Sequence, residues 1–146
     1  MDIIGNNLRT EFEAVNFKFK VFKAEHIKEI STEYEKLVAQ GLLEEAFYNN
    51  NLIGFDYDYK SKLKNVKSVI MIVARQCKSL AEFEYEGRVI EVTIPPTYLY
   101  PVINDQIERI MEKVIAKGGY SFTKAILPLK LLAARSGLGQ YGRNKK

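Results

Sequence analysis

The stretch from Val66 to Ala74 constrains the fold of this 146-residue chain most strongly, because it ends in six consecutive apolar residues. Most of these residues are β-branched, which favours a strand over a helix. A strand without alternating polar residues needs cover on both faces. Two segments with apolar residues at helical spacing, 24–40 and 102–117, are available to provide that cover.

Shorter patterns predict further elements. Residues 17–23 alternate apolar and basic side chains, which predicts a half-exposed strand. A second short helix is predicted over 42–48 and ends at the asparagines 49–51. Residues 82–94 predict a hairpin around the Glu-Gly pair at 86 and 87.

Together these patterns predict an α+β fold in a single domain spanning residues 1–146. We expect a central, mostly antiparallel sheet built from the 66–74 strand and the 82–94 hairpin. The helices 24–40 and 102–117 are expected to flank this sheet.

Composition bounds the function only loosely. Hydrophobic residues make up 47% and charged residues 27% of the chain, as in ordinary globular domains. No apolar run reaches the roughly 18 residues of a membrane span, and Met1-Asp2 does not begin a signal peptide. The lone cysteine, Cys77, excludes an internal disulfide and fits a reducing compartment, so we expect a cytoplasmic protein that does not engage a membrane.

Positive charge is concentrated at the C-terminal end. Residues 118–146 contain six basic side chains and no acid, whereas the rest of the chain has 16 basic and 18 acidic residues. Such a region favours an anionic neighbour, such as a cofactor phosphate, RNA or an acidic partner domain. A solvated terminus, with Lys145 and Lys146 as simple surface charges, is the alternative.

The same region is rich in glycine. A short helix is predicted from Pro128 to Arg135, and three glycines follow it, at 137, 139 and 142. A helix end needs one glycine, so three within six residues indicate a loop shaped around another group. We therefore treat 135–146 as a glycine-rich basic tail.

The segment AARSGLGQYGRN (133–144) resembles a motif of epoxyqueuosine reductases and related double iron–sulfur-cluster proteins. In that motif Leu-Ala-Ala-Arg-(Ser/Ala)-Gly-Leu-Gly leads into Gly-(Arg/Lys)-Asn. Upstream stretches occur in the same order as in the small cluster-binding branch of the family: EHIKEISTEYEKLVAQGLL, FYNNNLIGFDY, LKNVKSVIMIVARQ, EGRVIEVTIPPTY and ILPLKLLAARSGL. The resemblance extends from about Phe17, and 122–144 is its most specific part.

The resemblance implies an oxidoreductase module that binds cobalamin or substrate beside a ferredoxin-like half with two four-cysteine runs. Carried over residue by residue, it implies these cofactor-binding or domain-contact residues: Arg135, Ser136, Gly137, Leu138, Gly139, Tyr141, Gly142, Arg143 and Asn144. We add Tyr98 as a neighbouring contact. The two arginines would hold an anionic group, and without its partner the 135–144 loop is expected to be poorly anchored.

Two departures from the family pattern limit what the chain does alone. Residues 93–98 stand where the tRNA-modifying enzymes have their acidic proton donor, so that donor is missing. One cysteine cannot ligate an iron–sulfur cluster, so we expect no cluster and no turnover by this chain alone. No catalytic residue is assigned.

For the remaining candidate residues a structural role explains the sequence at least as well as a catalytic or binding role. His26 has no companion histidine and is expected at the surface or near a helix cap. Cys77 has no residue to activate it, and Asp56 and Asp58 fit turn formation as well as acid chemistry. The lysines and phenylalanines of 17–23 resemble a base-stacking stripe, but an edge strand with outward lysines explains them equally well.

Three interpretations remain open. The first is the cofactor- or substrate-binding module of a cluster-dependent reductase, which meets a ferredoxin-like domain. The second is a structural or homodimerisation module without a ligand. The third is a small protein that binds tRNA or other RNA through its basic tail.

Overall fold

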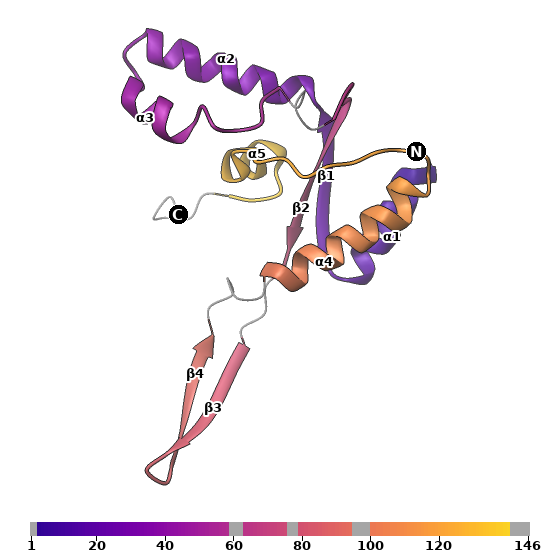
Figure 1. The fold of residues 1–146 in the computed structure, drawn as a ribbon, viewed down its shortest axis with the longest axis vertical. Helices are drawn as coiled ribbons and strands as arrows, with labels where there is room; N and C mark the ends of the chain where they lie inside the picture. Colours follow the sequence, from indigo (N-terminus) through magenta and orange to yellow (C-terminus); the bar gives the residue numbers. More distant parts are fainter. Residues whose placement is uncertain (1–2, 59–62, 76–78, 95–99, 141–146) are drawn as a thin grey trace. The chain divides into compact units, whose positions relative to one another are not determined.

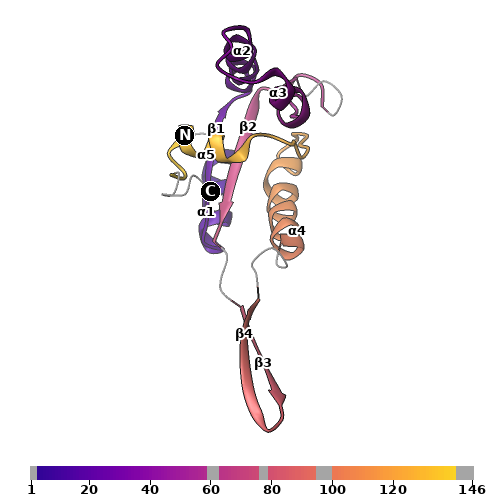
Figure 2. The same cartoon turned by 90° about the vertical axis from the view of Figure 1, so that its left-hand side faces the viewer.

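The computed structural model describes residues 3–58, 63–75, 79–94 and 100–140. Its elements follow one another in this order: α1 (Ile3–Ala14), β1 (Phe17–Lys23), α2 (Glu25–Ala39), α3 (Glu45–Asn51), β2 (Ser68–Ala74), β3 (Ser79–Tyr85), β4 (Arg88–Ile94), α4 (Tyr100–Met111), η2 (Glu112–Ala116) and α5 (Leu129–Ser136) (Figures 1 and 2). The predicted α+β class is confirmed. Within this part of the chain no helix is long and apolar enough to cross a membrane.

The residues group into two compact units, each assembled from two separate stretches of sequence. One unit comprises Met1–Lys18 with Val73–Tyr120, and the other comprises Phe19–Ile72 with Ser121–Lys146. β1 and β2 contribute residues to both units. Each unit is described by itself below.

The first unit contains a helical core. α1 packs against α4 and its continuation η2, a five-residue π-helical turn (Figure 1). α1 buries Leu8 and Phe12, four residues apart and therefore on one helix face. From the other side the buried side chains are Ile110, Met111, Val114 and Ile115. At the rim, Lys113 Nζ lies 2.7 Å from Glu11 Oε1.

The hairpin of the first unit matches the predicted position. β3 and β4 pair antiparallel, from Ser79 opposite Ile94 to Tyr85 opposite Arg88. The turn residues Glu86 and Gly87 have φ values of 50° and 72°. Two consecutive positive φ angles identify the type I′ turn, whose twist matches that of the paired strands.

The second unit contains α2, α3, α5 and most of the β1–β2 pair. β1 and β2 run antiparallel side by side (Figure 1). Its core comprises Ala24, Ile27, Ile30, Met71, Leu127 and Leu132. Ile27 and Ile30 are at most 1% exposed, because the apolar stripe of α2 faces inward as its periodicity predicted. α2 ends at Ala39 with Gln40 as its C-cap, and Gly41 follows with a φ of 67°. The Gly41 amide donates to the Val38 carbonyl, and the Leu42 amide donates to the Leu37 carbonyl.

The strand pairing corrects one expectation. Among the described residues the predicted 66–74 strand pairs with 17–23 and not with the hairpin, so they form two two-stranded sheets instead of one central sheet. β2 is also less covered than predicted: Met71 is buried, and the other apolar residues of this strand are half-buried. Pairing partners depend on contacts distant in sequence, which local periodicity does not encode.

Two helices differ from the sequence predictions. α3 begins at Glu45 and extends through the asparagines that were expected to end it. Asn51 is accommodated because its side-chain amide donates to the Phe47 carbonyl at 3.0 Å. α1 was not predicted, although its Leu8 and Phe12 have the spacing of a helix face.

Candidate functional site

The segment that leads into α5 is tied to the loop after α3. The Asp56 carboxylate accepts the Ile126 amide at 2.6 Å, and the Asp56 amide donates to the Ile126 carbonyl at 2.7 Å. Together these two hydrogen bonds fix the chain two residues before Pro128, the N-cap of α5. The Leu132 amide then donates to the Pro128 carbonyl and closes the first turn. The start of the motif helix is therefore set by a contact across 70 residues of sequence.

α5 packs into the core of its unit through one face. Leu132 is 5% exposed and belongs to the core cluster with Ile27, Ile30 and Met71. Leu131 and Ala133 pack at the edge of this cluster, as does Leu138 beyond the helix end. The apolar residues of the LLAARSGLG sequence thus stabilise the unit.

The end of α5 is a Schellman motif. Gly137 adopts the left-handed conformation with φ of 72°. Its amide donates to the Ala134 carbonyl at 3.2 Å, and the amides of Leu138 and Gly139 both donate to Ala133, at 3.0 and 3.1 Å. The backbone donors of 137–139 are therefore used within the chain.

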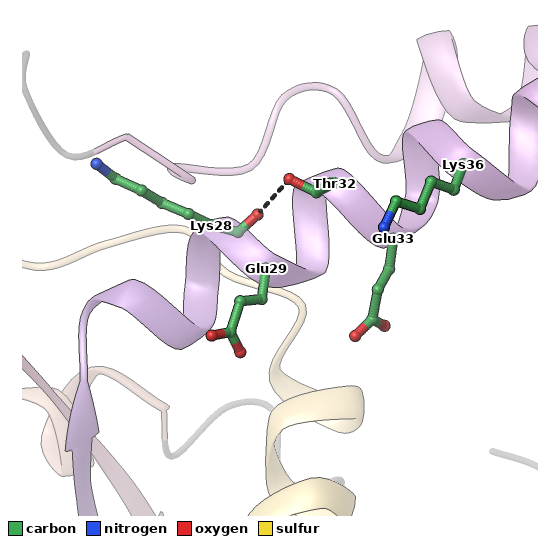
Figure 3. Close-up of a pocket in the computed structure, with 5 residues that line it drawn as sticks. All are labelled: Lys28, Glu29, Thr32, Glu33 and Lys36. Atoms are coloured by element: carbon green, nitrogen blue, oxygen red, sulfur yellow. Dashed lines mark hydrogen bonds between the residues drawn. The ribbon is translucent and has the colours of Figure 1, made fainter.

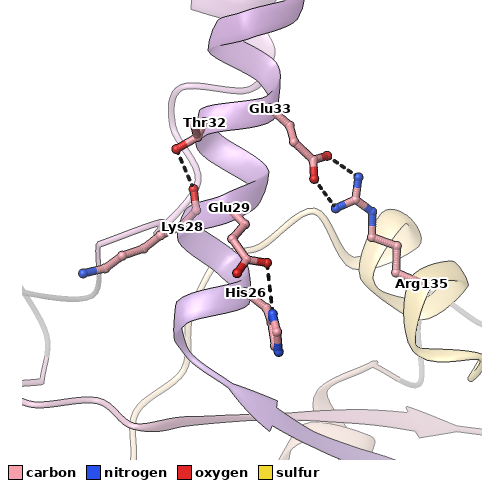
Figure 4. A network of polar contacts seen from close by, with 6 residues as sticks. All are labelled: His26, Lys28, Glu29, Thr32, Glu33 and Arg135. Carbon is pink, nitrogen blue, oxygen red and sulfur yellow. Dashed lines mark hydrogen bonds and ion pairs between the residues drawn. The ribbon is translucent and has the colours of Figure 1, made fainter.

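The arginine of the motif contacts α2. Both terminal nitrogens of Arg135 donate to the Glu33 carboxylate, with Nη1 3.2 Å from Oε1 and Nη2 bonded to Oε2 (Figure 4). The hydrogen bonding to Arg135 holds the pKa of Glu33 below its usual value of 4.5. Desolvation raises this pKa, but the positive charges of Arg135 and Lys36 lower it further, so the net shift is downward. Such two-point pairing fixes orientation as well as distance, so it sets where α5 lies along α2.

A shallow hollow of about 400 Å³ lies on the exposed side of α2. It is lined by Lys28, Glu29, Thr32, Glu33 and Lys36 (Figure 3). The lining contains two carboxylates and two ammonium groups. The Thr32 hydroxyl donates to the Lys28 carbonyl at 3.3 Å. The hollow therefore has no charge preference, and we assign it no ligand.

A tyrosine hydroxyl is enclosed at the edge of the same core. Tyr57 Oη is buried and has no hydrogen-bond partner among the described residues. Burial raises the pKa of Tyr57 to about 12, and the neighbouring Tyr34 and Tyr48 add to this shift. Its ring meets the Phe55 ring edge-to-face at a centroid distance of 6.0 Å. This hydroxyl is held in its neutral form.

The structure describes only part of the predicted site. Arg135 and Ser136 end α5, and Gly137, Leu138 and Gly139 form its cap. The Ser136 hydroxyl donates to the Ala133 carbonyl at 3.2 Å, inside its own helix. The other predicted residues lie outside the described residues: Tyr98, Tyr141, Gly142, Arg143 and Asn144.

The expectation of a poorly anchored loop is wrong for residues 135–139. The ion pair to Glu33, the three cap hydrogen bonds and the packing of Leu138 all hold this segment to its unit. The error has a physical source, because the left-handed conformation of Gly137 lets the chain turn back onto its own helix end. For 141–144 the expectation stays a prediction.

The other residues considered as candidates from the sequence make structural contacts or lie on the surface where the structure describes them. His26 Nδ1 lies 3.0 Å from Glu29 Oε2 on the exposed surface, in the first turn of α2 as expected. Asp56 forms the tie to Ile126, and the Asp58 carboxylate lies 4.0 Å from Lys28 Nζ. Cys77 falls outside the described residues. Lys18 and Lys20 are exposed beside the more buried Phe17 and Phe19, as an edge strand requires.

Sequence reasoning did not find Glu33 or Tyr57. Glu33 reads as an ordinary exposed residue of an amphipathic helix, and 102 positions separate it from Arg135. Tyr57 lies beside the two aspartates that attracted attention. No local pattern signals either residue, because each matters only through tertiary contacts.

The described residues do not by themselves fit a cobalamin or a metal. The amides of 137–139 and the Arg135 guanidinium already have partners. Within the described ranges no group of three or more His, Cys, Asp or Glu side chains is placed to hold a metal ion.

Comparison with known proteins adds no relative: no family model, no curated protein and no solved structure matches this chain.

Proposed function

We propose that this chain is the N-terminal, cofactor- or substrate-binding module of an epoxyqueuosine reductase-like oxidoreductase. In this proposal a ferredoxin-like partner domain supplies the iron–sulfur clusters, and this chain supplies a binding surface in the cytoplasm. The support is the resemblance of the 133–144 segment, together with the order of the stretches upstream of it, which resembles the order in that family. The chain has one cysteine, so electron transfer is assigned to the partner.

The observation that carries the proposal is the anchoring of α5. Its start is tied to Asp56, its middle packs through Leu132, and its end is held by Arg135 and the Gly137 cap. A binding segment gains affinity when the structure before it is already ordered, because less entropy is lost on binding. The 133–139 segment therefore serves as the support, and the binding donors follow it.

This division assigns different roles to the two arginines of the motif. Arg135 is a positioning residue that acts through Glu33. Arg143, with Tyr141 and Asn144, is proposed to contact the ligand. An arginine at such a site suits a phosphate or carboxylate group, since its planar fork donates two parallel hydrogen bonds.

The experiment is an absorbance titration of hydroxocobalamin with the purified chain. We expect a saturable change in the corrinoid spectrum at one site per chain. An unchanged spectrum at all protein concentrations would remove the cofactor-binding assignment.

A parallel titration with tRNA tests the competing function. Binding that weakens steeply with added salt, in the absence of any corrinoid binding, would identify the chain as an RNA-binding protein. Absence of both interactions would leave the structural or dimerisation role.

A further inference from the structure

The two faces of the β3–β4 hairpin differ in character. Residues directly opposite one another share a face, so the register divides the hairpin into two sets. One set is mainly apolar, with Ala81, Phe83, Tyr85, Ile90, Val92 and Ile94, and it has Ser79 and Arg88 at its two ends. The other set contains the acids Glu82, Glu84 and Glu91.

This hairpin lacks cover in the part of the chain that the structure describes. Phe83 is 48% and Tyr85 60% exposed on the apolar face. Glu82 stands directly opposite Glu91, and like charges in that position destabilise a strand pair. A two-stranded hairpin is only marginally stable by itself. A third strand with basic residues would stabilise it by adding backbone hydrogen bonds and by placing positive charges beside the acids.

β1 has the complementary pattern. Its Lys18 and Lys20 lie on one face, and Phe17 and Phe19 lie on the other, because side chains alternate along a strand. β1 belongs to a two-stranded sheet, so among the described residues one of its edges has no neighbouring strand. Open edges of this kind favour pairing with another strand.

We propose that the edge of β3 pairs with the edge of β1 in a second copy of this chain. The resulting sheet has the order β2-β1 from one copy followed by β3-β4 from the other. Lys18 and Lys20 then lie beside Glu82 and Glu84 on one face. On the opposite face the half-buried Phe19 of the first copy extends the apolar surface of the hairpin, next to Phe17, which is buried in its own chain.

The occupant is a second copy because both halves of the match lie in this sequence. The sequence FKFK in β1 complements EFEY in β3. On one face lysines would lie beside glutamates, and on the other face aromatic residues would lie beside aromatic residues. β4 offers a poorer edge, since it presents a single acid, Glu91, between Val89 and Thr93. If each copy gives its hairpin to the other, the two contacts are equivalent and the dimer closes with twofold symmetry.

The test uses two charge-reversed variants and their mixture. Glu82→Lys/Glu84→Lys makes both strands basic, and Lys18→Glu/Lys20→Glu makes both acidic. The mass of each species is measured by light scattering after size-exclusion chromatography over a range of concentrations. We expect a wild-type dimer and, for either variant alone, a dissociation constant raised by about tenfold or more.

Mixing the two variants distinguishes pairing between copies from pairing within one chain. In a mixed dimer both contacts again join a basic strand to an acidic one, so we expect dimers to reform. Within one chain the charges would still repel in either variant. The control Glu44→Lys/Glu45→Lys changes the net charge equally on exposed residues of the α2–α3 region, and we expect it to leave the dimer unchanged.

Three results would overturn the proposal. They are a wild-type chain that stays monomeric at every concentration, reversed variants that dimerise like the wild type, and a mixture that stays monomeric. If a reversed variant does not fold, wild-type hydrogen exchange decides instead. We expect the amides of 17–23 and 79–85 to gain protection with concentration, and unchanged exchange would equally overturn the proposal.

Discussion

Arg135 illustrates how one side chain of a motif acquires its role. Sequence resemblance assigned it to an anionic ligand, but its two donors meet a carboxylate of the same chain. Because both partners are about half exposed, solvent and salt weaken the pair. We therefore assign this pair an orienting role and a modest contribution to stability.

The size of that contribution can be measured with a double-mutant cycle. We expect Arg135→Ala and Glu33→Ala each to lower the free energy of unfolding, with a coupling of about 0.5–1 kcal/mol between them. Denaturant unfolding of the two single variants and the double variant gives the coupling. Strictly additive effects would show that the pair contributes nothing.

The coupling should also depend on pH. The pKa of Glu33 is lowered in the folded chain, so the ionised carboxylate stabilises the fold at every pH above its usual pKa of 4.5. It is lost as the pH falls through the folded pKa, which lies below that value. A coupling that survives complete protonation of Glu33 would contradict this assignment.

Tyr57 gives a second prediction at the residue scale. We expect Tyr57→Phe to leave stability unchanged or to raise it by up to about 1 kcal/mol, because the hydroxyl is buried without a described partner. The raised pKa means that the folded chain favours the neutral Tyr57 hydroxyl more than the unfolded chain does. The stability linked to this difference is fully present below pH 10 and is lost as the pH rises towards about 12. The variant should therefore lose less stability than the wild type over that range.

Absorbance at 295 nm follows tyrosine ionisation directly. The wild type should show a component that titrates with a pKa of about 12, and the variant should lack it. Tyr85, which is 60% exposed on the hairpin, provides the control Tyr85→Phe, which should leave that component in place. A large loss of stability in Tyr57→Phe would indicate that the hydroxyl has a partner.

At the scale of elements, the end of α5 separates two glycines that look equivalent in sequence. Gly137 has a φ of 72°, whereas Gly139 is in a conformation open to other residues, with 3.4 Å between an added Cβ and the Ala133 side chain. We expect Gly137→Ala to cost about 1–2 kcal/mol and Gly139→Ala to cost little. Thermal unfolding of the two variants compares them. Equal effects would mean that the left-handed cap is not what holds the segment.

The elements also show which features of the fold local sequence patterns can predict. The boundaries of α2 and α5 were predicted to within one residue, because their periodicity and end signals lie within a few residues of one another. The turn and the end of the hairpin were predicted too, although β3 begins at Ser79, three residues before the expected start. The pairing of β2 with β1 was not predicted, since that choice depends on residues about 50 positions apart. The same reason explains Arg135: its motif was visible, but its partner on α2 was not.

At the scale of the whole molecule, the 133–144 segment is proposed to consist of a support and a group of binding residues. Residues 133–139, all of them described, are bonded and packed within their unit. Ligand contact is proposed for the residues that follow. The two arginines belong to different parts of this division, so they should respond differently to removal.

The most direct measurement compares Arg135→Ala and Arg143→Ala for thermal stability and for hydroxocobalamin binding, with Lys145→Ala as the control for lost positive charge. The account predicts that Arg143→Ala weakens binding at least about tenfold without changing the melting temperature, as a lost charge-assisted contact would. Arg135→Ala should lower the melting temperature, and Lys145→Ala should change neither quantity. Unaltered corrinoid binding in Arg143→Ala, or a melting temperature lowered by Arg143→Ala and not by Arg135→Ala, would contradict it.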